Sequence, residues 1–219
     1  MRILLIRHGQ TPANVLGLLD TAHPGPGLTK LGHQQASAVP DALADENIEG
    51  VFASTLRRTQ LTAEPLARAR RLGALVTDGL HEISAGALEG LSDEKSQMTY
   101  VDTVFSWAAG DLSRTMPGGS DGHEFFGRFD GAIDAIAREH SGTVAIVSHG
   151  AAIRTWTGAR AVNVDVDYAA THPLSNTGVV DVTGSPSDGW RVSQWDGNPI
   201  GGRALLDVSA NDPTGDALR

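Results

Sequence analysis

The fold is decided by one short stretch near the start of the chain, Ile3-Leu4-Leu5-Ile6-Arg7-His8-Gly9. Four consecutive apolar residues are typical of a strand that is buried on both faces of a parallel sheet. The polar residues that follow stand at the carboxyl end of this strand, and open α/β sheets bind their ligands at that edge. The stretch therefore predicts a layered α/β protein with His8 at its ligand-binding edge.

Further apolar runs alternate with helical patterns along the chain. The predicted strands cover residues 3–6, 50–53, 74–77, 143–147, 179–183 and 191–195, and the predicted helices cover residues 29–45, 55–71, 122–140 and 151–161. This alternation indicates helices packed against a largely parallel sheet. We expect an α/β fold, a three-layer α/β/α sandwich with a mostly parallel central sheet. Pro40 and Pro65 should kink or split the first two helices.

The length of 219 residues suits a single domain that covers residues 1–219. Within it, residues 92–122 have weak periodicity and several turn residues, so we expect a partly helical insertion or lid. Residues 197–219 are rich in Gly, Pro and Asp, a composition that predicts a loosely ordered tail.

The composition excludes several kinds of protein. No run of 18 apolar residues occurs, which excludes a membrane span, and the amino terminus lacks the features of a signal peptide, so we expect a cytoplasmic protein. The formal net charge of -9 argues against binding to nucleic acid. The chain has no cysteine, and its eight histidines show no metal-binding spacing, so we expect neither a metal nor another cofactor.

A second predicted strand ends in the same way as the first. Residues 143–147 are followed by Ser148-His149-Gly150, so two histidines from distant parts of the chain would face one crevice. Neutral imidazole attacks phosphorus when its other nitrogen donates to a fixed acceptor. Arg7 offers a fork of donors to phosphoryl oxygens, and Gly9 lets the backbone approach an anion closely. We therefore expect a phosphoryl site at this edge of the sheet.

A third predicted strand ends at Ala53 and is followed by Ser54-Thr55-Leu56-Arg57-Arg58-Thr59. We expect Ser54 to cap the next helix. Arg57, in the first turn, and the helix amino terminus would both favour an anion. Arg58 is expected to be a solvated charge on the helix surface.

These motifs together resemble the signature of the histidine phosphatase superfamily, in its phosphoglycerate-mutase-like branch. The resemblance spans about residues 2–195, and an ordered set of this kind is highly specific. Residues 7–14 are similar to the family pattern R-H-G-[EQ]-[ST]-x-x-N, and residues 28–36 to L-T-x-x-G-x-x-Q-A. Residues 54–63 are similar to S-x-L-x-R-[AT]-x-x-T-A, and residues 82–90 to E-x-x-x-G-x-x-E-G. Residues 148–150 resemble the second histidine motif, and residues 174–177 a late asparagine turn.

The resemblance implies a phosphohistidine at His8. The groups that it implies around the phosphoryl oxygens are Arg7, Asn14, Arg57 and His149, together with the glycines Gly9 and Gly150. Two arginines and a protonated His149 can neutralise a phosphoryl group without a metal, because phosphoryl transfer depends mainly on positioning and charge.

The resemblance also implies a proton donor, Glu82. This residue would protonate the leaving alkoxide and then act as the base that activates water. Partial burial and a bound dianion should raise its pKa for this role. Glu89 is the carboxylate that competes with Glu82 for the assignment.

Two departures from the family pattern favour a phosphatase over a mutase. The usual P-G-G-E-S element reads Pro117-Gly118-Gly119-Ser120-Asp121. The Arg or Lys set that grips a second anionic group in mutases has no clear counterpart, because residues 92–122 hold only Lys95 and Arg114 as cations. We therefore expect a metal-independent phosphatase, a hydrolase that cleaves small phosphomonoesters through a phosphohistidine intermediate. The alternatives are a phosphoglycerate mutase and a catalytically silent phosphoryl-binding module.

Substrate specificity is expected to lie in residues 92–122 and in the loop 16–27, which hold apolar groups and few cations. We therefore predict a preference for substrates without a second anionic group. The expected partner is a small phosphorylated substrate, with a homodimer as one option for the assembly. Nucleic acid and membranes are not expected partners.

Overall fold

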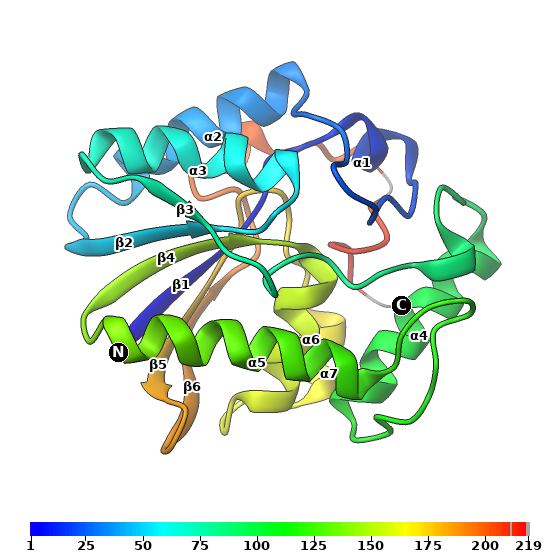
Figure 1. Cartoon of the computed structure of the whole chain (residues 1–219). Helices are drawn as coiled ribbons and strands as arrows, with labels where there is room; N and C mark the ends of the chain where they lie inside the picture. The colour runs from blue at the N-terminus through cyan, green and yellow to red at the C-terminus, as the bar shows by residue number, and fades with distance from the viewer. Residues whose placement is uncertain (211, 218–219) are drawn as a thin grey trace.

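A central sheet organises the protein (Figure 1), which a computed structural model describes for residues 1–210 and 212–217. Its strands within these residues are β1 (Arg2–Arg7), β2 (Ile48–Ala53), β3 (Ala74–Val76), β4 (Thr143–Ser148), β5 (Val179–Ser185) and β6 (Gly189–Asp196). They lie in the order β3-β2-β4-β1-β5-β6. The pairs β3–β2, β2–β4 and β4–β1 are parallel, whereas the pairs β1–β5 and β5–β6 are antiparallel. The mostly parallel sheet is thus confirmed.

Helices cover both faces of this sheet, which gives the predicted three layers (Figure 1). On one face lie α2 (Lys30–Ala42) and α3 (Arg57–Ala69). On the other lie α5 (Gly122–Glu139), α6 (Gly150–Arg160) and α7 (Val166–Thr171). The remaining helices are α1 (Pro12–Leu16), α4 (Glu94–Ala108) and two short 3-10 turns at Gly86–Leu88 and Arg203–Leu205.

Strand β1 supplies apolar side chains to both layers, as its unbroken apolar run predicts. Ile3 and Leu5 pack with the core beneath α5 and α6. Leu4 and Ile6 pack with the core beneath α2 and α3. Because side chains alternate along a strand, these four consecutive residues pack into the hydrophobic clusters on both faces of the sheet.

The helices α2 and α3 run on past Pro40 and Pro65, so neither is split there. A proline inside a helix removes one backbone hydrogen bond. In α2 the buried apolar side chains, such as Val39, lie before Pro40, whereas in α3 they lie on both sides of Pro65, as Ala63 and Leu66 do. Tertiary packing of this kind supplies most of the stability of a helix in a protein and offsets the lost bond.

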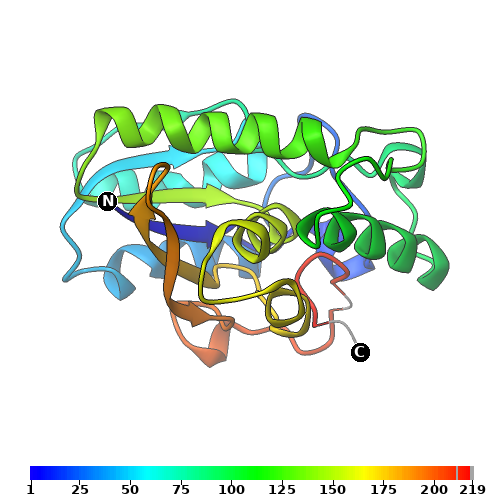
Figure 2. The same cartoon turned by 90° about the horizontal axis from the view of Figure 1, so that it is seen from below.

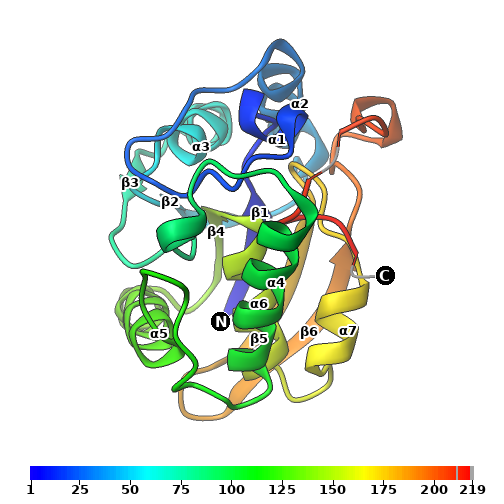
Figure 3. The same ribbon diagram turned by 90° about the vertical axis from the view of Figure 1, so that its right-hand side faces the viewer.

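Residues 92–122 form α4 and a loop that returns to α5. The helix begins at Asp93, whose side chain accepts a hydrogen bond from the backbone of Ser96. Its buried face carries Tyr100, Val104 and Trp107, and it packs against α6 (Figure 3).

Among the described residues, no helix combines the length and the apolar content that a membrane crossing requires.

Within the tail predicted to be loosely ordered, residues 212–215 are held against the sheet edge, whereas residues 201–204 and 208–209 are exposed. Asp212 is only 7% exposed, and the carbonyl of Gly215 accepts a hydrogen bond of 2.8 Å from the backbone of Leu174. Figure 2 shows the last described residues between α4 and α7. The Gly, Pro and Asp residues of this segment thus form turns that a buried arginine holds in place. Residues 211, 218 and 219 lie outside the described part of the tail.

Candidate active site

Strands β1 and β4 bring the two strand-end histidines together. Arg7 pairs with Ser148 in the parallel register, so the next residue on each strand, His8 and His149, emerges at the same edge. Their ring centroids lie 5.2 Å apart, and both rings are buried. The structure thus brings the two predicted histidines into contact at the carboxyl end of the strands.

The imidazole of His8 has the tautomer that a nucleophile needs. Its Nδ1 lies 2.8 Å from the carbonyl oxygen of Gly9, which can only accept a hydrogen bond. Nδ1 therefore carries the proton and Nε2 keeps its lone pair. Burial, and then the charges of Arg58 and Arg7, lower the pKa of His8 well below its ordinary value. The ring is therefore neutral at neutral pH.

His149 stands at the start of α6 and contacts a hydroxyl. Its Nε2 lies 2.7 Å from Oγ of Ser54, which in turn lies 2.9 Å from the hydroxyl of Thr59. Ser54 therefore orients this ring and does not cap α3, whose capping position is Leu56. Burial, followed by the nearby Arg58, lowers the pKa of His149 well below its ordinary value. The ring is neutral here, in contrast to the protonated form that was expected.

The second arginine of the site is Arg58 and not Arg57. Arg58 is 2% exposed and lines a small cavity together with His8, whereas Arg57 is exposed. Both residues stand in the first turn of α3, and successive helix residues point about 100° apart, so only one of them can face the crevice. The expectation that Arg58 is solvated is wrong. The pattern S-x-L-x-R, counted from Ser54, already places the family arginine at position 58.

Arg58 is held by the loop that follows α1. Its Nη2 donates to the carbonyl of Asp20 at 2.9 Å, and its Nη1 lies 3.8 Å from the carboxylate of the same residue. Glu89 fixes this loop, because its carboxylate accepts from the backbone of Thr21 at 2.8 Å and of Ala22 at 3.0 Å. Within the described residues, the buried Nη1 makes no hydrogen bond. It is a donor available to an anion.

Glu82 lies across the cavity from the arginine, at the amino terminus of α6. Its carboxylate accepts from the backbone of Ala151 at 3.2 Å, of Ala152 at 2.9 Å and of Ile83 at 2.9 Å. Burial raises its pKa, although these bonds and Arg58 act in the opposite direction. A raised pKa suits a general acid. Of the two candidate carboxylates, Glu82 lines the cavity, while Glu89 is engaged with the backbone of the loop.

The small cavity has a volume of about 10 Å³ and is also lined by Asn14, Thr11 and Thr214. Asn14 uses its Oδ1 to accept from the backbone of Thr11 at 2.9 Å and from Asn176 at 3.3 Å. Its amide nitrogen remains as the donor for an anion. Asn14 also belongs to the capping box of α1, so the same side chain stabilises the start of that helix.

The glycines next to the two histidines serve close backbone packing. A Cβ atom on Gly9 would lie 2.7 Å from the carbonyl oxygen of Gly32, and the amide of Gly9 donates to Thr62. That amide is therefore engaged within the chain, although Gly9 was expected to lie next to the bound phosphoryl group. A Cβ atom on Gly150 would lie 2.5 Å from the carbonyl oxygen of Thr214 and 3.0 Å from Nε of Arg7.

Arg7 is completely buried, and its terminal nitrogens are engaged by other parts of the chain. Nη1 donates to the carbonyl of Leu174 at 2.7 Å. Nη2 donates to the carboxylate of Asp212 and to the hydroxyl of Thr214, the latter at 3.0 Å. In this structure Arg7 is thus neutralised by a carboxylate from the tail, which the sequence did not lead us to expect.

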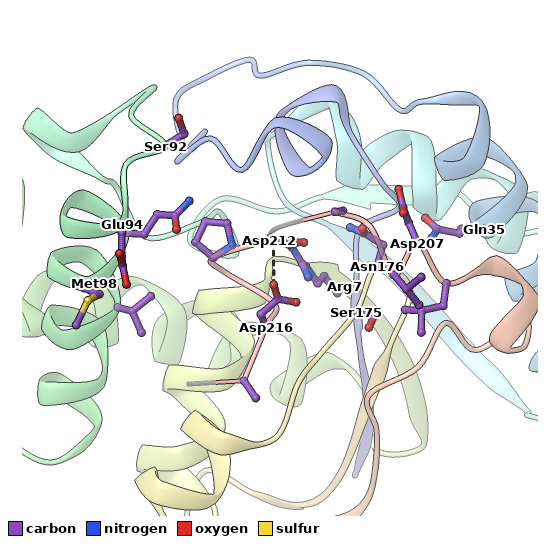
Figure 4. Close-up of a pocket in the computed structure, with 17 residues that line it drawn as sticks. Arg7, Gln35, Ser92, Glu94, Met98, Ser175, Asn176, Asp207, Asp212 and Asp216 are labelled. Atoms are coloured by element: carbon purple, nitrogen blue, oxygen red, sulfur yellow. Dashed lines mark hydrogen bonds and ion pairs between the residues drawn. The ribbon is translucent and has the colours of Figure 1, made fainter. Parts of the chain in front are cut away.

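A larger cavity of about 970 Å³ adjoins the site (Figure 4). It touches the His8 region through Asn176, whose side chain donates to the carbonyl of His8 at 3.0 Å. Its acidic lining residues are Glu94, Asp207, Asp212 and Asp216, and Arg7 is the one cation among its described lining residues. Within residues 1–210 and 212–217, no three His, Cys, Asp or Glu side chains are grouped as a metal site would require.

Comparison with known proteins agrees with these features. The sequence model of the histidine phosphatase superfamily (branch 1) matches residues 3–197. The PE-PGRS family protein PE_PGRS11 of Mycobacterium tuberculosis is 39% identical over 217 residues, which cover 91% of this chain and 37% of that protein. This chain thus spans little more than a third of the length of that relative.

Two further relatives carry descriptive names. Phosphoserine phosphatase 1 of Hydrogenobacter thermophilus is 28% identical over 154 residues, which cover 68% of this chain and 71% of that protein. The structure of a mycobacterial glucosyl-3-phosphoglycerate phosphatase superposes with a TM-score of 0.75 at 24% identity, covering 90% of this chain and 99% of that one. This second likeness concerns the fold alone.

Proposed function

Because the chain belongs to the histidine phosphatase superfamily, branch 1, we propose that it hydrolyses small phosphomonoesters through a phosphohistidine at His8. One observation carries the proposal. The lone pair on Nε2 of His8 is fixed by the bond from Nδ1 to Gly9, and the same cavity holds Arg58 and the carboxyl group of Glu82. A nucleophile, a cation and a proton donor are the groups that phosphoryl transfer to a side chain needs.

In the first step, Nε2 of His8 attacks phosphorus and the bond from phosphorus to the ester oxygen breaks. Glu82 gives its proton to the departing alkoxide, so that an alcohol leaves. Three buried nitrogens of the site make no hydrogen bond within the described residues, namely Nη1 of Arg58, Nε of Arg7 and Nδ1 of His149. In this proposal they donate to the phosphoryl oxygens, and Nδ1 of His149 carries the proton while Ser54 donates to Nε2. They stabilise the charge that develops on these oxygens.

In the second step, water attacks the phosphoryl group on His8. Glu82, now a carboxylate, takes a proton from this water, the bond from nitrogen to phosphorus breaks, and inorganic phosphate leaves. Both steps use the same groups, and the cycle returns His8 and Glu82 to their starting states.

The larger cavity supports hydrolysis over mutase activity and a preference for leaving groups without a second anion. Its acidic side chains Glu94 and Asp207 would repel a carboxylate or a second phosphate on the leaving group. The similarity to phosphoserine phosphatase 1 also supports hydrolysis. A cytoplasmic location and a homodimer stay predictions from the sequence.

The proposal is tested by brief incubation with p-nitrophenyl phosphate, followed by peptide mass mapping under conditions that preserve acid-labile phosphate. We expect phosphate on His8 in the wild type, none in His8→Ala, and unchanged labelling in His33→Ala, a control at an exposed histidine of α2. Phosphate on any other residue would contradict the mechanism. Phosphate release from phosphoglycerates without an isomerised product separates a phosphatase from a mutase.

A further inference from the structure

We propose that residues 212–217, here called the covering segment, block the active site from within and are displaced by the phosphoryl group of the substrate. The inference rests on the proposed function, because it takes Arg7 and His8 as phosphoryl-binding groups. Three features of the structure carry it: what pairs with Arg7, what closes the space above His8, and how the segment is attached.

The covering segment pairs with the arginine that an incoming phosphoryl group would need. Asp212 offers Arg7 a carboxylate, a planar anion that binds guanidinium in the same way as a phosphoryl group does. Thr214 accepts from the same nitrogen of Arg7. Nη1 is bound to Leu174, and Nε of Arg7 makes no hydrogen bond within the described residues. A phosphoryl group that binds the outer edge of the guanidinium through Nη2 therefore competes with Asp212 for that nitrogen.

The covering segment also closes the space above His8. Thr214 is part of the wall of the small cavity, whose 10 Å³ accommodates about one water molecule. A phosphoryl group with its oxygen atoms requires several times that space. On its other side the segment borders the cavity of about 970 Å³, through Asp212, Pro213 and Asp216. Withdrawal of the segment would therefore join the two spaces into a pocket that reaches from His8 to α4.

The attachment of the segment is specific, yet mainly polar. Arg154, a buried residue of α6, donates to the carbonyl of Thr214 at 3.2 Å and to that of Asp216 at 2.8 Å. The same guanidinium holds the carbonyls of Ala169 and Ala170 at the end of α7. The segment has no large apolar side chain to bury, because its residues are Asp, Pro, Thr, Gly, Asp and Ala. Segments with few buried apolar contacts open at low free energy, so an anion can compete for them.

An internal blocker has a quantitative consequence for anion binding. When only a fraction of the molecules is open, the apparent dissociation constant is the intrinsic constant divided by that fraction. Asp212→Asn removes the charge that holds the segment on Arg7 and increases the open fraction. We expect inorganic phosphate to bind Asp212→Asn about tenfold more tightly than the wild type, the order of magnitude of one charge-assisted hydrogen bond.

This expectation is measured by isothermal titration of the full chain with inorganic phosphate. The matched control is Asp188→Asn, at an exposed aspartate of the turn between β5 and β6, which should bind phosphate like the wild type. Equal or weaker binding to Asp212→Asn would show that the carboxylate positions Arg7 and does not block it. If neither protein binds phosphate, and His8 is not phosphorylated by substrate, the proposed function fails together with this inference.

A second variant reports on movement of the segment directly. The chain has no cysteine, so Thr214→Cys carries a single thiol. In the closed structure this side chain lines the small cavity and is only partly exposed, so phosphate that displaces the segment should accelerate alkylation of the thiol by iodoacetamide several-fold. Slower alkylation in the presence of phosphate would show that the segment closes over a bound anion, which would overturn the proposal.

Discussion

Substitution of Arg58 tests which of two adjacent arginines belongs to the site. Arg58 is 2% exposed, and its Nη2 is engaged by the carbonyl of Asp20, which leaves Nη1 as the nitrogen that binds a phosphoryl oxygen. Loss of one pre-organised donor to a charged transition state costs about 10²- to 10³-fold in kcat. Because Arg58→Ala also removes a buried positive charge beside His8, we expect a loss in kcat/KM toward the upper end of that range.

The assay is steady-state hydrolysis of p-nitrophenyl phosphate by three variants. Arg57→Ala should keep its activity within about twofold, because exposed side chains away from a site have small effects. Arg58→Lys should recover only part of the loss, because an ammonium restores the charge without the planar fork that reaches both Asp20 and the substrate. Substitution of Arg58 by Ala removes the ion pair with Asp20, so thermal unfolding of each variant shows whether a loss of activity comes from a loss of stability. A larger loss in Arg57→Ala than in Arg58→Ala would refute the assignment.

Three further outcomes are expected. Glu82→Gln should lower kcat/KM, which reports the phosphorylation step, by about 10²- to 10⁴-fold for an alkyl phosphate. The loss should be far smaller for p-nitrophenyl phosphate, whose leaving group needs no proton, and equal losses in kcat/KM on both substrates would exclude Glu82 as the acid. Burial holds the pKa of His8 and His149 below the ordinary value of 6.5, so kcat/KM should persist as the pH falls through 6.5. Over the same pH range the free energy of unfolding should fall, because the histidines of the unfolded chain take up protons that the buried rings do not. Urea unfolding at several pH values measures this change, and a constant free energy of unfolding would contradict the burial of the two histidines as neutral rings. Gly32→Ala should destabilise the fold by about 2 kcal/mol or more, because its Cβ atom would lie 2.1 Å from a backbone oxygen. The control Gly127→Ala in α5, where a Cβ atom would meet nothing within 4 Å, should be neutral or stabilising in the same urea unfolding assay.

The sequence predicted the parts of the site that depend on strands. Apolar residues on both faces of β1 and β4 indicate buried parallel strands, and the carboxyl ends of such strands share one edge. The meeting of His8 and His149 follows from that arrangement alone. The phase of a helix at its first turn is less certain, because one residue more or less before the helix rotates every side chain by about 100°. Helix phase alone therefore leaves Arg57 and Arg58 open, whereas the spacing of the S-x-L-x-R pattern points to Arg58.

The pairing of Arg7 with Asp212 could not be predicted from the sequence. The two residues lie far apart in the chain, and a single aspartate among glycines, a proline and a threonine has the composition of any surface turn. No periodic pattern marks the covering segment, because it belongs to no helix or strand. Its place in the fold depends on two buried arginines from other elements, Arg7 and Arg154, and therefore becomes visible only in three dimensions.

The register of β1 against β4 has a consequence for how this chain tolerates changes in length. The pairing of Arg7 with Ser148 sets the separation of the two histidines. One residue inserted within residues 143–148 would shift His149 by about 3.3 Å along the strand and turn its side chain to the opposite face of the sheet. An insertion in the exposed turn at residues 186–188 would leave that pairing untouched. Variation in length is therefore expected at the far end of the β5–β6 hairpin and excluded from β4, even where the inserted residue is as apolar as its neighbours.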